Sequence, residues 1–242
     1  LALEGDESLS EKLPFIKSSL NVVIEKDITK YRQRKVRLLN GGHTANVPAS
    51  FLAGLDTVAE MMNDEITGRF ARQTIKNIIL PSVSMDRQML EDFASAVIER
   101  FQNPFIKHQL LSILLNCTSK FKVRVLPSLL EYQEKFGTFP QNLCFSFAAY
   151  IYLYKSNERN GQPFEFTDDA AALDKLHAAW KLYDNSLTGA NSVAERILGD
   201  SDLWDKDLTV YPELVRDVGK YLYEIDIKGT KKIMQSLLMD ED

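Results

Sequence analysis

Apolar residues recur at intervals of three and four over most of this chain, and this spacing constrains the fold more than any other feature of the sequence. Residues at such intervals share one face of an α-helix. One series, which includes a histidine, consists of Val36, Leu39, His43, Val47, Phe51, Leu55 and Val58. The best strand candidate is the β-branched run at residues 20–25. We therefore predict a mainly α, multi-helical fold with at most a minor strand near residues 20–25.

The chain is long enough for a substantial core. Its 242 residues, 45% of them hydrophobic, can form one large domain or a compact pair. Residues 1–14 are polar and charged, so we interpret them as the end of a linker and residues 15–242 as the helical domain.

Three local signals predict where helices bend or begin. Gly41-Gly42 and Pro48 predict a kink or break in the first long helix. Asn103-Pro104 predicts the start of a buried central helix that continues through residue 115. Ser192-Val-Ala-Glu195 resembles a capping box for a short helix that ends near residue 199.

The charges are unevenly distributed along an acidic chain with a net charge of −5. Residues 28–55 and residues 100–130 each contain five basic and no acidic residues, while the rest contains 19 basic and 34 acidic residues. We interpret the two windows as parts of one electropositive pocket, with a solvated basic surface as the alternative. An otherwise acidic molecule would repel nucleic acid, so we expect no nucleic-acid partner.

Several classes of site lack their sequence signals. None of His43, His108 and His177 has another His or Cys three or four residues away, so we expect no metal site. No Gly-rich dinucleotide or phosphate loop is present, so we expect no cofactor-binding residues in this chain. No signal peptide or apolar run of about 18 residues appears, so we expect no membrane partner. Cys117 and Cys144 lie in apolar surroundings, which favours buried free thiols and a cytoplasmic location.

The strongest candidate for chemistry is the segment that contains Lys35, Asn40 and His43. On an α-helix the three residues fall at roughly 0°, 140° and 80°, so they can face one side. A partly desolvated lysine beside other cations would have a lowered pKa and could act as a general base. The amide and imidazole N–H groups could hold a carbonyl or alkoxide oxygen. The alternative is purely structural: a solvated lysine, a helix-breaking amide and a packed histidine.

The second basic window suggests where an anion would bind. Arginine and lysine can clamp a substrate carboxylate, or they can form a solvated helix face. Both interpretations stay open for Arg100 and Lys120, and the solvated face is favoured for Lys107.

These residues resemble a known family. Lys35-x4-Asn40-x2-His43 matches the signature of the mannitol dehydrogenase family, the polyol-specific long-chain dehydrogenases. Arg100-Phe-Gln-Asn103-Pro104, followed by His108 and Ser119-Lys120, is similar to a second region of that family's C-terminal domain. The longer strings at 34–44, 103–108 and 124–129 are most similar to its tagaturonate reductase (altronate oxidoreductase) branch. The resemblance is specific over residues 15–135 and vague after Phe136.

The resemblance implies a two-domain NAD-dependent enzyme. An N-terminal Rossmann domain of the same polypeptide would bind NAD, and a helical domain similar to the C-terminal domain of 6-phosphogluconate dehydrogenase would bind the substrate. Lys35 would be the general acid/base, with Asn40 and His43 polarising the reacting oxygen. Substrate contacts are expected from Arg37, Arg100, Asn103, His108 and Lys120. The dinucleotide domain is missing here, so we expect an inactive C-terminal fragment.

The expected substrate is a small-molecule sugar acid, and the expected reaction is the metal-independent interconversion of altronate and tagaturonate. The carboxylate of these sugars agrees with the electropositive pocket inferred from charge alone. The alternatives are a fructuronate/mannonate or neutral polyol dehydrogenase of the same family, and a helical interaction domain without catalysis.

Overall fold

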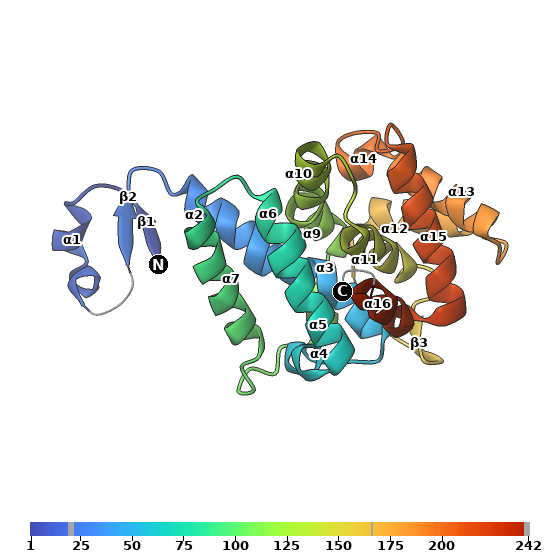
Figure 1. Cartoon of the computed structure of the whole chain (residues 1–242), viewed down its shortest axis with the longest axis horizontal. Coiled ribbons are helices and arrows are strands. Elements are labelled where there is room, and N and C mark those ends of the chain that lie inside the picture. The colour runs from blue at the N-terminus through green and yellow to red at the C-terminus, as the bar shows by residue number, and fades with distance from the viewer. Residues whose placement is uncertain (19–21, 166, 240–242) are drawn as a thin grey trace.

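A computed structural model of the chain describes residues 1–18, 22–165 and 167–239, which are predominantly helical (Figure 1). The N-terminal elements are β1 (Ala2–Glu4), α1 (Leu9–Lys12), the 3-10 helix η1 (Pro14–Lys17) and β2 (Val23–Glu25). The next elements are α2 (Thr29–Arg34), η2 (Lys35–Gly41), α3 (Gly42–Leu52), α4 (Val58–Asn63), α5 (Glu65–Gln73), η3 (Thr74–Ile79), α6 (Leu80–Ser82) and α7 (Arg87–Phe101). Then come α8 (Leu110–Leu114), α9 (Cys117–Arg124), α10 (Leu126–Phe136), α11 (Gln141–Tyr152), β3 (Glu158–Arg159) and β4 (Gln162–Pro163). The last helices are α12 (Ala170–Trp180), α13 (Leu187–Leu198), α14 (Ser201–Trp204), α15 (Pro212–Lys228) and α16 (Thr230–Met239). The predicted mainly α fold is confirmed.

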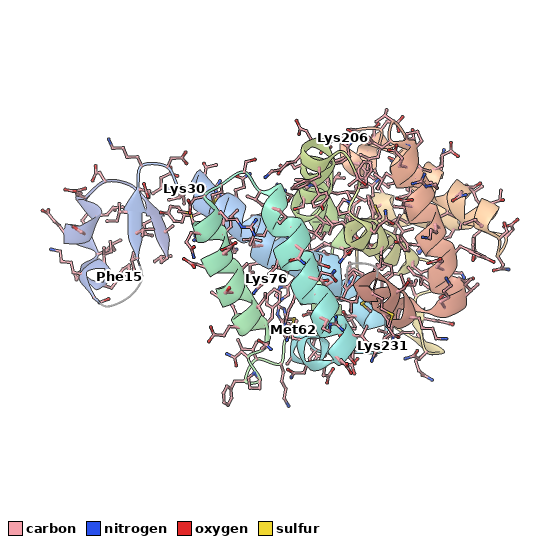
Figure 2. The ribbon with its side chains drawn as sticks, viewed as in Figure 1. Phe15, Lys30, Met62, Lys76, Lys206 and Lys231 are labelled. Atoms are coloured by element: carbon pink, nitrogen blue, oxygen red, sulfur yellow. The ribbon has the colours of Figure 1, made fainter. Side chains whose placement is uncertain are left out.

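A small N-terminal unit projects from one end of the helical body (Figure 1). In it β1 and β2 form a parallel pair in which Ala2 lies opposite Val23. The predicted strand is therefore present at Val23–Glu25, whereas Leu20 and Asn21 lie outside the described residues. The segment 1–14, expected to be the end of a linker, contains β1 and α1. Lys30 lies where this unit meets α2, and its Nζ is 3.1 Å from Oε1 of Glu25 (Figure 2).

The core of the body is centred on α11. This helix is buried over most of its length and packs against α3 and α15, while α13 packs against α15. The helix α16 packs against α5, and Lys231 forms an ion pair with Asp64 there (Figure 2). Cys117 and Cys144 are buried free thiols, as predicted. None of the described helices is long and apolar enough to cross a bilayer.

The predicted break is absent at Gly41-Gly42, where η2 passes directly into α3, and at Pro48, which lies inside α3. The φ angles of Gly41 and Gly42 are −66° and −57°, which are ordinary helical values. What departs from the α-helix is the seven-residue π-helix η2, Lys35–Gly41, a rare form often found near functional sites. The glycines serve close packing instead. A Cβ on Gly41 would lie 2.8 Å from the carbonyl oxygen of Arg124.

The predicted central helix from Asn103 to residue 115 is also wrong over its first half. The chain forms a loop up to α8, and the side chain of Phe105 is 93% exposed. Two contacts explain the loop. Asn103 Oδ1 accepts a hydrogen bond from the backbone N–H of Phe105 at 3.0 Å, and the His108 carbonyl accepts one from the N–H of Val58 at 3.0 Å. The first contact is an Asx turn, and the second belongs to an antiparallel bridge between Thr57 and Gln109, whose extended backbone cannot be part of a helix.

The predicted capping box at Ser192 lies in the middle of α13. This helix begins at Leu187, and its cap is Ser186, whose Oγ accepts a hydrogen bond from the N–H of Gly189 at 3.0 Å. Ser192 Oγ donates to the carbonyl of Thr188, as serine side chains inside helices do. The earlier cap extends the helix by more than a turn.

Candidate active site

A cavity of about 310 Å³ lies beside the junction of η2 and α3, within the size range of small-molecule sites. Its walls come from the end of η2, the start of α3 and of α4, the end of α7, the loop that follows α7, and the helices α8 and α9. The lining residues are Leu39, Asn40, His43, Val58, Arg100, Phe101, Asn103, Ile106, His108, Ser112, Ile113, Lys120 and Arg124. Two predicted catalytic residues and four predicted substrate-binding residues therefore meet in one cavity.

Asn40 and His43 reach the cavity because they lie at the end of η2 and the start of α3. Residues three apart share a helix face, so both side chains lie on the side that faces α7 and α9. The backbone around them is held by side chains: Thr44 Oγ1 donates to the Asn40 carbonyl at 2.9 Å, and Asn46 Nδ2 donates to the Gly42 carbonyl at 2.8 Å. These bonds fix the helical turn that carries the imidazole.

His43 is held as a neutral imidazole. Its ring stacks on Phe101, with centroids 3.8 Å apart and planes 11° apart, and meets the edge of His108 at 5.4 Å. Burial, together with the nearby His108, Arg100 and Arg124, lowers the pKa of His43 to about 3. The Nε2 atom is buried and has no hydrogen-bond partner within the described structure. A buried polar atom without a partner is costly, so this atom is poised to bind a ligand.

The cations of the cavity come from the second basic window. Lys120 and Arg124 lie on successive turns of α9, and burial lowers the pKa of both side chains. The charge of Arg124 lowers the pKa of Lys120 further. Arg100 contributes from the end of α7. Among the described residues, no carboxylate forms an ion pair with any of these three side chains, so the cavity is electropositive.

Lys35 and Arg37 do not line this cavity. Lys35 is exposed on η2, so this chain does not provide the partly desolvated setting that the sequence suggested. Residues five apart lie about one turn apart in a π-helix, so Lys35 and Asn40 share a face of η2. Arg37 is 3% exposed on another face, where Glu131 binds its guanidinium at 2.8 and 2.9 Å and Ser128 accepts from its Nε at 2.7 Å. The structure therefore gives Arg37 a packing role, because its donors are already occupied.

Arg124 was not among the predicted site residues. The sequence feature that could have identified it is its position four residues after Lys120, because residues four apart lie on one face of a helix. The sequence did not show that this face points to Asn40 and His43. That follows from the packing of α9 against η2 and α3, which brings both side chains into the wall of the same cavity.

A buried network fixes the other end of α9. Asp168, which is 6% exposed, accepts hydrogen bonds from the backbone N–H of Thr118 at 2.8 Å and from its hydroxyl at 2.7 Å. Tyr154 donates to the same carboxylate oxygen. A carboxylate at a helix N-terminus satisfies free N–H groups and complements the helix dipole. Asp168 thereby anchors the helix that presents Lys120 and Arg124.

The described residues do not supply a cradle for a dinucleotide. The turn between β1 and α1 has a strand–turn–helix order, but it carries Asp6 and Glu7, whose carboxylates would repel a pyrophosphate. Its helix is four residues long. Within the described ranges, no group of three or more His, Cys, Asp or Glu side chains is arranged to hold a metal ion.

The comparisons with known proteins agree on one family. The family model of the mannitol dehydrogenase C-terminal domain matches residues 27–226. Altronate oxidoreductase of Escherichia coli O7:K1 is 44% identical over 235 residues, which cover 97% of this chain and 48% of that protein. The same enzyme of Escherichia coli O139:H28 is 43% identical over the same lengths. The chain thus spans about half the length of the curated relatives it matches.

Two solved structures have the same fold. Pseudomonas fluorescens mannitol 2-dehydrogenase, in a ternary complex with NAD and D-mannitol, matches with a TM-score of 0.79 at 22% identity, over 91% of this chain and 43% of that one. A substrate-free D-sorbitol dehydrogenase matches with a TM-score of 0.70 at 22% identity, over 87% of this chain and 41% of that one. Together with the family model and the identity to altronate oxidoreductases, these matches confirm the resemblance noted in the Lys35–His43 segment: the chain belongs to the mannitol dehydrogenase C-terminal domain family.

Proposed function

We propose that this chain is the substrate-binding and catalytic part of an NAD-dependent oxidoreductase that interconverts D-altronate and D-tagaturonate without a metal ion. The relatives that are 44% identical are altronate oxidoreductases. The observation that carries the proposal is the cavity itself. It combines a neutral His43 with a free Nε2, the amide of Asn40, and cations without a carboxylate partner in the described structure.

Each group has a distinct task in this proposal. Asn40 and His43 donate hydrogen bonds to the oxygen of the reacting C–OH or C=O group, which stabilises developing negative charge on that oxygen. Lys35 exchanges the proton of that oxygen as general base in oxidation and as general acid in reduction. Its position one π-turn before Asn40 supports this role. The cations bind the substrate carboxylate.

NAD binding is assigned to an N-terminal Rossmann domain of the same polypeptide, because the residues that the structure describes do not form a cradle for a dinucleotide. The proposal therefore gives the chain only the tasks of binding the sugar acid and moving the proton. The chain by itself is expected to be inactive.

The test joins the chain to a dinucleotide-binding domain and follows NADH oxidation with tagaturonate. Lys35→Ala should lower kcat by about 100-fold or more, the usual contribution of general acid–base catalysis. Lys76→Ala is the matched control, since Lys76 (Figure 2) is an exposed lysine of the π-helix η3 and is not among the residues that line the cavity. An active wild type with an equally active Lys35→Ala variant would refute the assigned role of Lys35.

Related substrates are separated by the same assay. Comparing kcat/KM for tagaturonate, fructuronate and fructose distinguishes the proposed enzyme from a fructuronate/mannonate or a neutral polyol dehydrogenase. A preference for neutral fructose would contradict the role of the cations. A non-catalytic interaction domain would show no turnover with any of the three.

A further inference from the structure

The basic side chains of α9 divide into a paired and an unpaired set. Lys122 points away from the cavity, where its Nζ is 2.7 Å from a carboxylate oxygen of Asp205. Lys120 and Arg124 line the cavity and have no carboxylate partner within the described ranges. Lys155, a half-buried lysine elsewhere in the body, is in contrast paired with Asp226. Leaving two adjacent cations unpaired costs free energy, and an anionic ligand would recover it.

Arg124 is better placed than Lys120 to bind a carboxylate. The Lys120 ammonium already donates to the carbonyl of Ile113 at 3.0 Å. The Arg124 guanidinium has one long contact, from Nη1 to Thr44 Oγ1 at 3.5 Å, which is the limit for a hydrogen bond. Most of its donors therefore remain free. A planar guanidinium can bind both oxygens of a carboxylate, whereas an ammonium acts as a point charge.

The backbone places Arg124 at a fixed position relative to the reacting groups. Its carbonyl packs against Gly41, between Asn40 and the turn that carries His43. Thr44, the contact of its guanidinium, in turn donates to the Asn40 carbonyl. A sugar acid held at its C–OH group by Asn40 and His43 would thus have its carboxylate within the same cavity as Arg124.

We propose that Arg124 binds the substrate carboxylate and is the residue that selects sugar acids over neutral polyols. This inference rests on the proposed function, because it assumes that the cavity binds a sugar acid. Lys120 adds charge, while Arg124 supplies the two-point geometry.

The test uses the chain joined to its dinucleotide-binding domain and compares two substrates. One is altronate, and the other is the neutral hexitol of the same configuration, in which CH₂OH replaces the carboxylate. Arg124→Gln should lower kcat/KM for altronate by about 100-fold, the loss expected for a hydrogen bond to a charged group. The value for the hexitol should stay within a few-fold of wild type, so the ratio of the two values falls. Arg124→Lys should retain part of the preference.

Lys122→Gln is the control, because it removes a cation from the same helix outside the cavity. Thermal unfolding of each variant checks that the fold is intact, and Arg124→Lys decides the question if Arg124→Gln does not fold. Equal losses for both substrates, or no loss for altronate, would overturn the role of Arg124 and leave the proposed function standing. A wild-type enzyme that oxidises the hexitol but not altronate would overturn both.

Discussion

Gly41→Ala tests whether close packing between η2 and α9 holds the site together. The new Cβ would lie 2.8 Å from the Arg124 carbonyl oxygen and 3.4 Å from the Val36 carbonyl oxygen. The first pair must separate by roughly half an ångström to reach ordinary contact, and both partners are backbone atoms that cannot rotate away. Overpacking of this kind costs about 1–3 kcal/mol. Alanine recovers about 0.5–1 kcal/mol in a helix, so we expect a net loss of about 1–2 kcal/mol in the free energy of unfolding.

Urea denaturation followed by circular dichroism measures this loss as a lower midpoint concentration of urea, with an unchanged dependence of the unfolding free energy on urea concentration. Gly42→Ala is the matched control, since it gains the same helix propensity but its Cβ would meet side-chain carbons of Ile75, at 3.1 Å, and no backbone atom. We expect its midpoint to lie close to that of the wild type. Equal effects of the two substitutions, or a stabilised Gly41→Ala variant, would refute the packing argument.

Two further predictions concern His43 and Asp168. The pKa of His43 in the folded protein is about 3, which is below the ordinary value of 6.5. As the pH falls, the imidazole is therefore protonated in the unfolded chain before it is protonated in the folded one. The contribution of neutral His43 to the free energy of unfolding is complete above pH 6.5 and is lost as the pH falls towards 3. His43→Gln should therefore reduce the pH dependence of the unfolding free energy in that range by up to about 1.4 kcal/mol per pH unit, and identical slopes in denaturant titrations would contradict this. Asp168→Asn should lower the unfolding free energy by about 2–4 kcal/mol, because an amide nitrogen would face hydrogen-bond donors in a buried site. The exposed Asp174→Asn on α12 should change it little, and similar denaturation midpoints for the two variants would exclude the anchoring role of Asp168.

The sequence predicted the helical fold and the family because both depend on local patterns. The spacing of apolar residues indicates helices wherever a single face is buried, and Lys35-x4-Asn40-x2-His43 is a contiguous motif. Sequence signals for helix starts gave a wrong prediction where contacts with a distant segment determine the backbone conformation. The loop at Asn103–His108 formed in place of a helix because Val58 pairs with it.

The site shows the same division between local and distant information. Charge counting along the sequence indicated an electropositive pocket, but it assigned cations from both basic windows. In the structure, the cations that line the pocket all come from the second window. Arg37, from the first window, is instead buried in an ion pair with Glu131. Which face of a helix a cation occupies follows from residue spacing, whereas what that face meets depends on how helices pack.

The sequence by itself therefore determined the helical class, the family and the presence of Asn40, His43 and a cationic site. The tertiary structure alone decided the π-helical form of Lys35–Gly41, the neutral state of His43 and the place of Arg124 beside it. The physical reason is that hydrophobic periodicity and motif spacing are properties of neighbouring residues. The desolvation of His43, the ion pair of Arg37 and the backbone contact at Gly41 arise between segments that are far apart in the sequence.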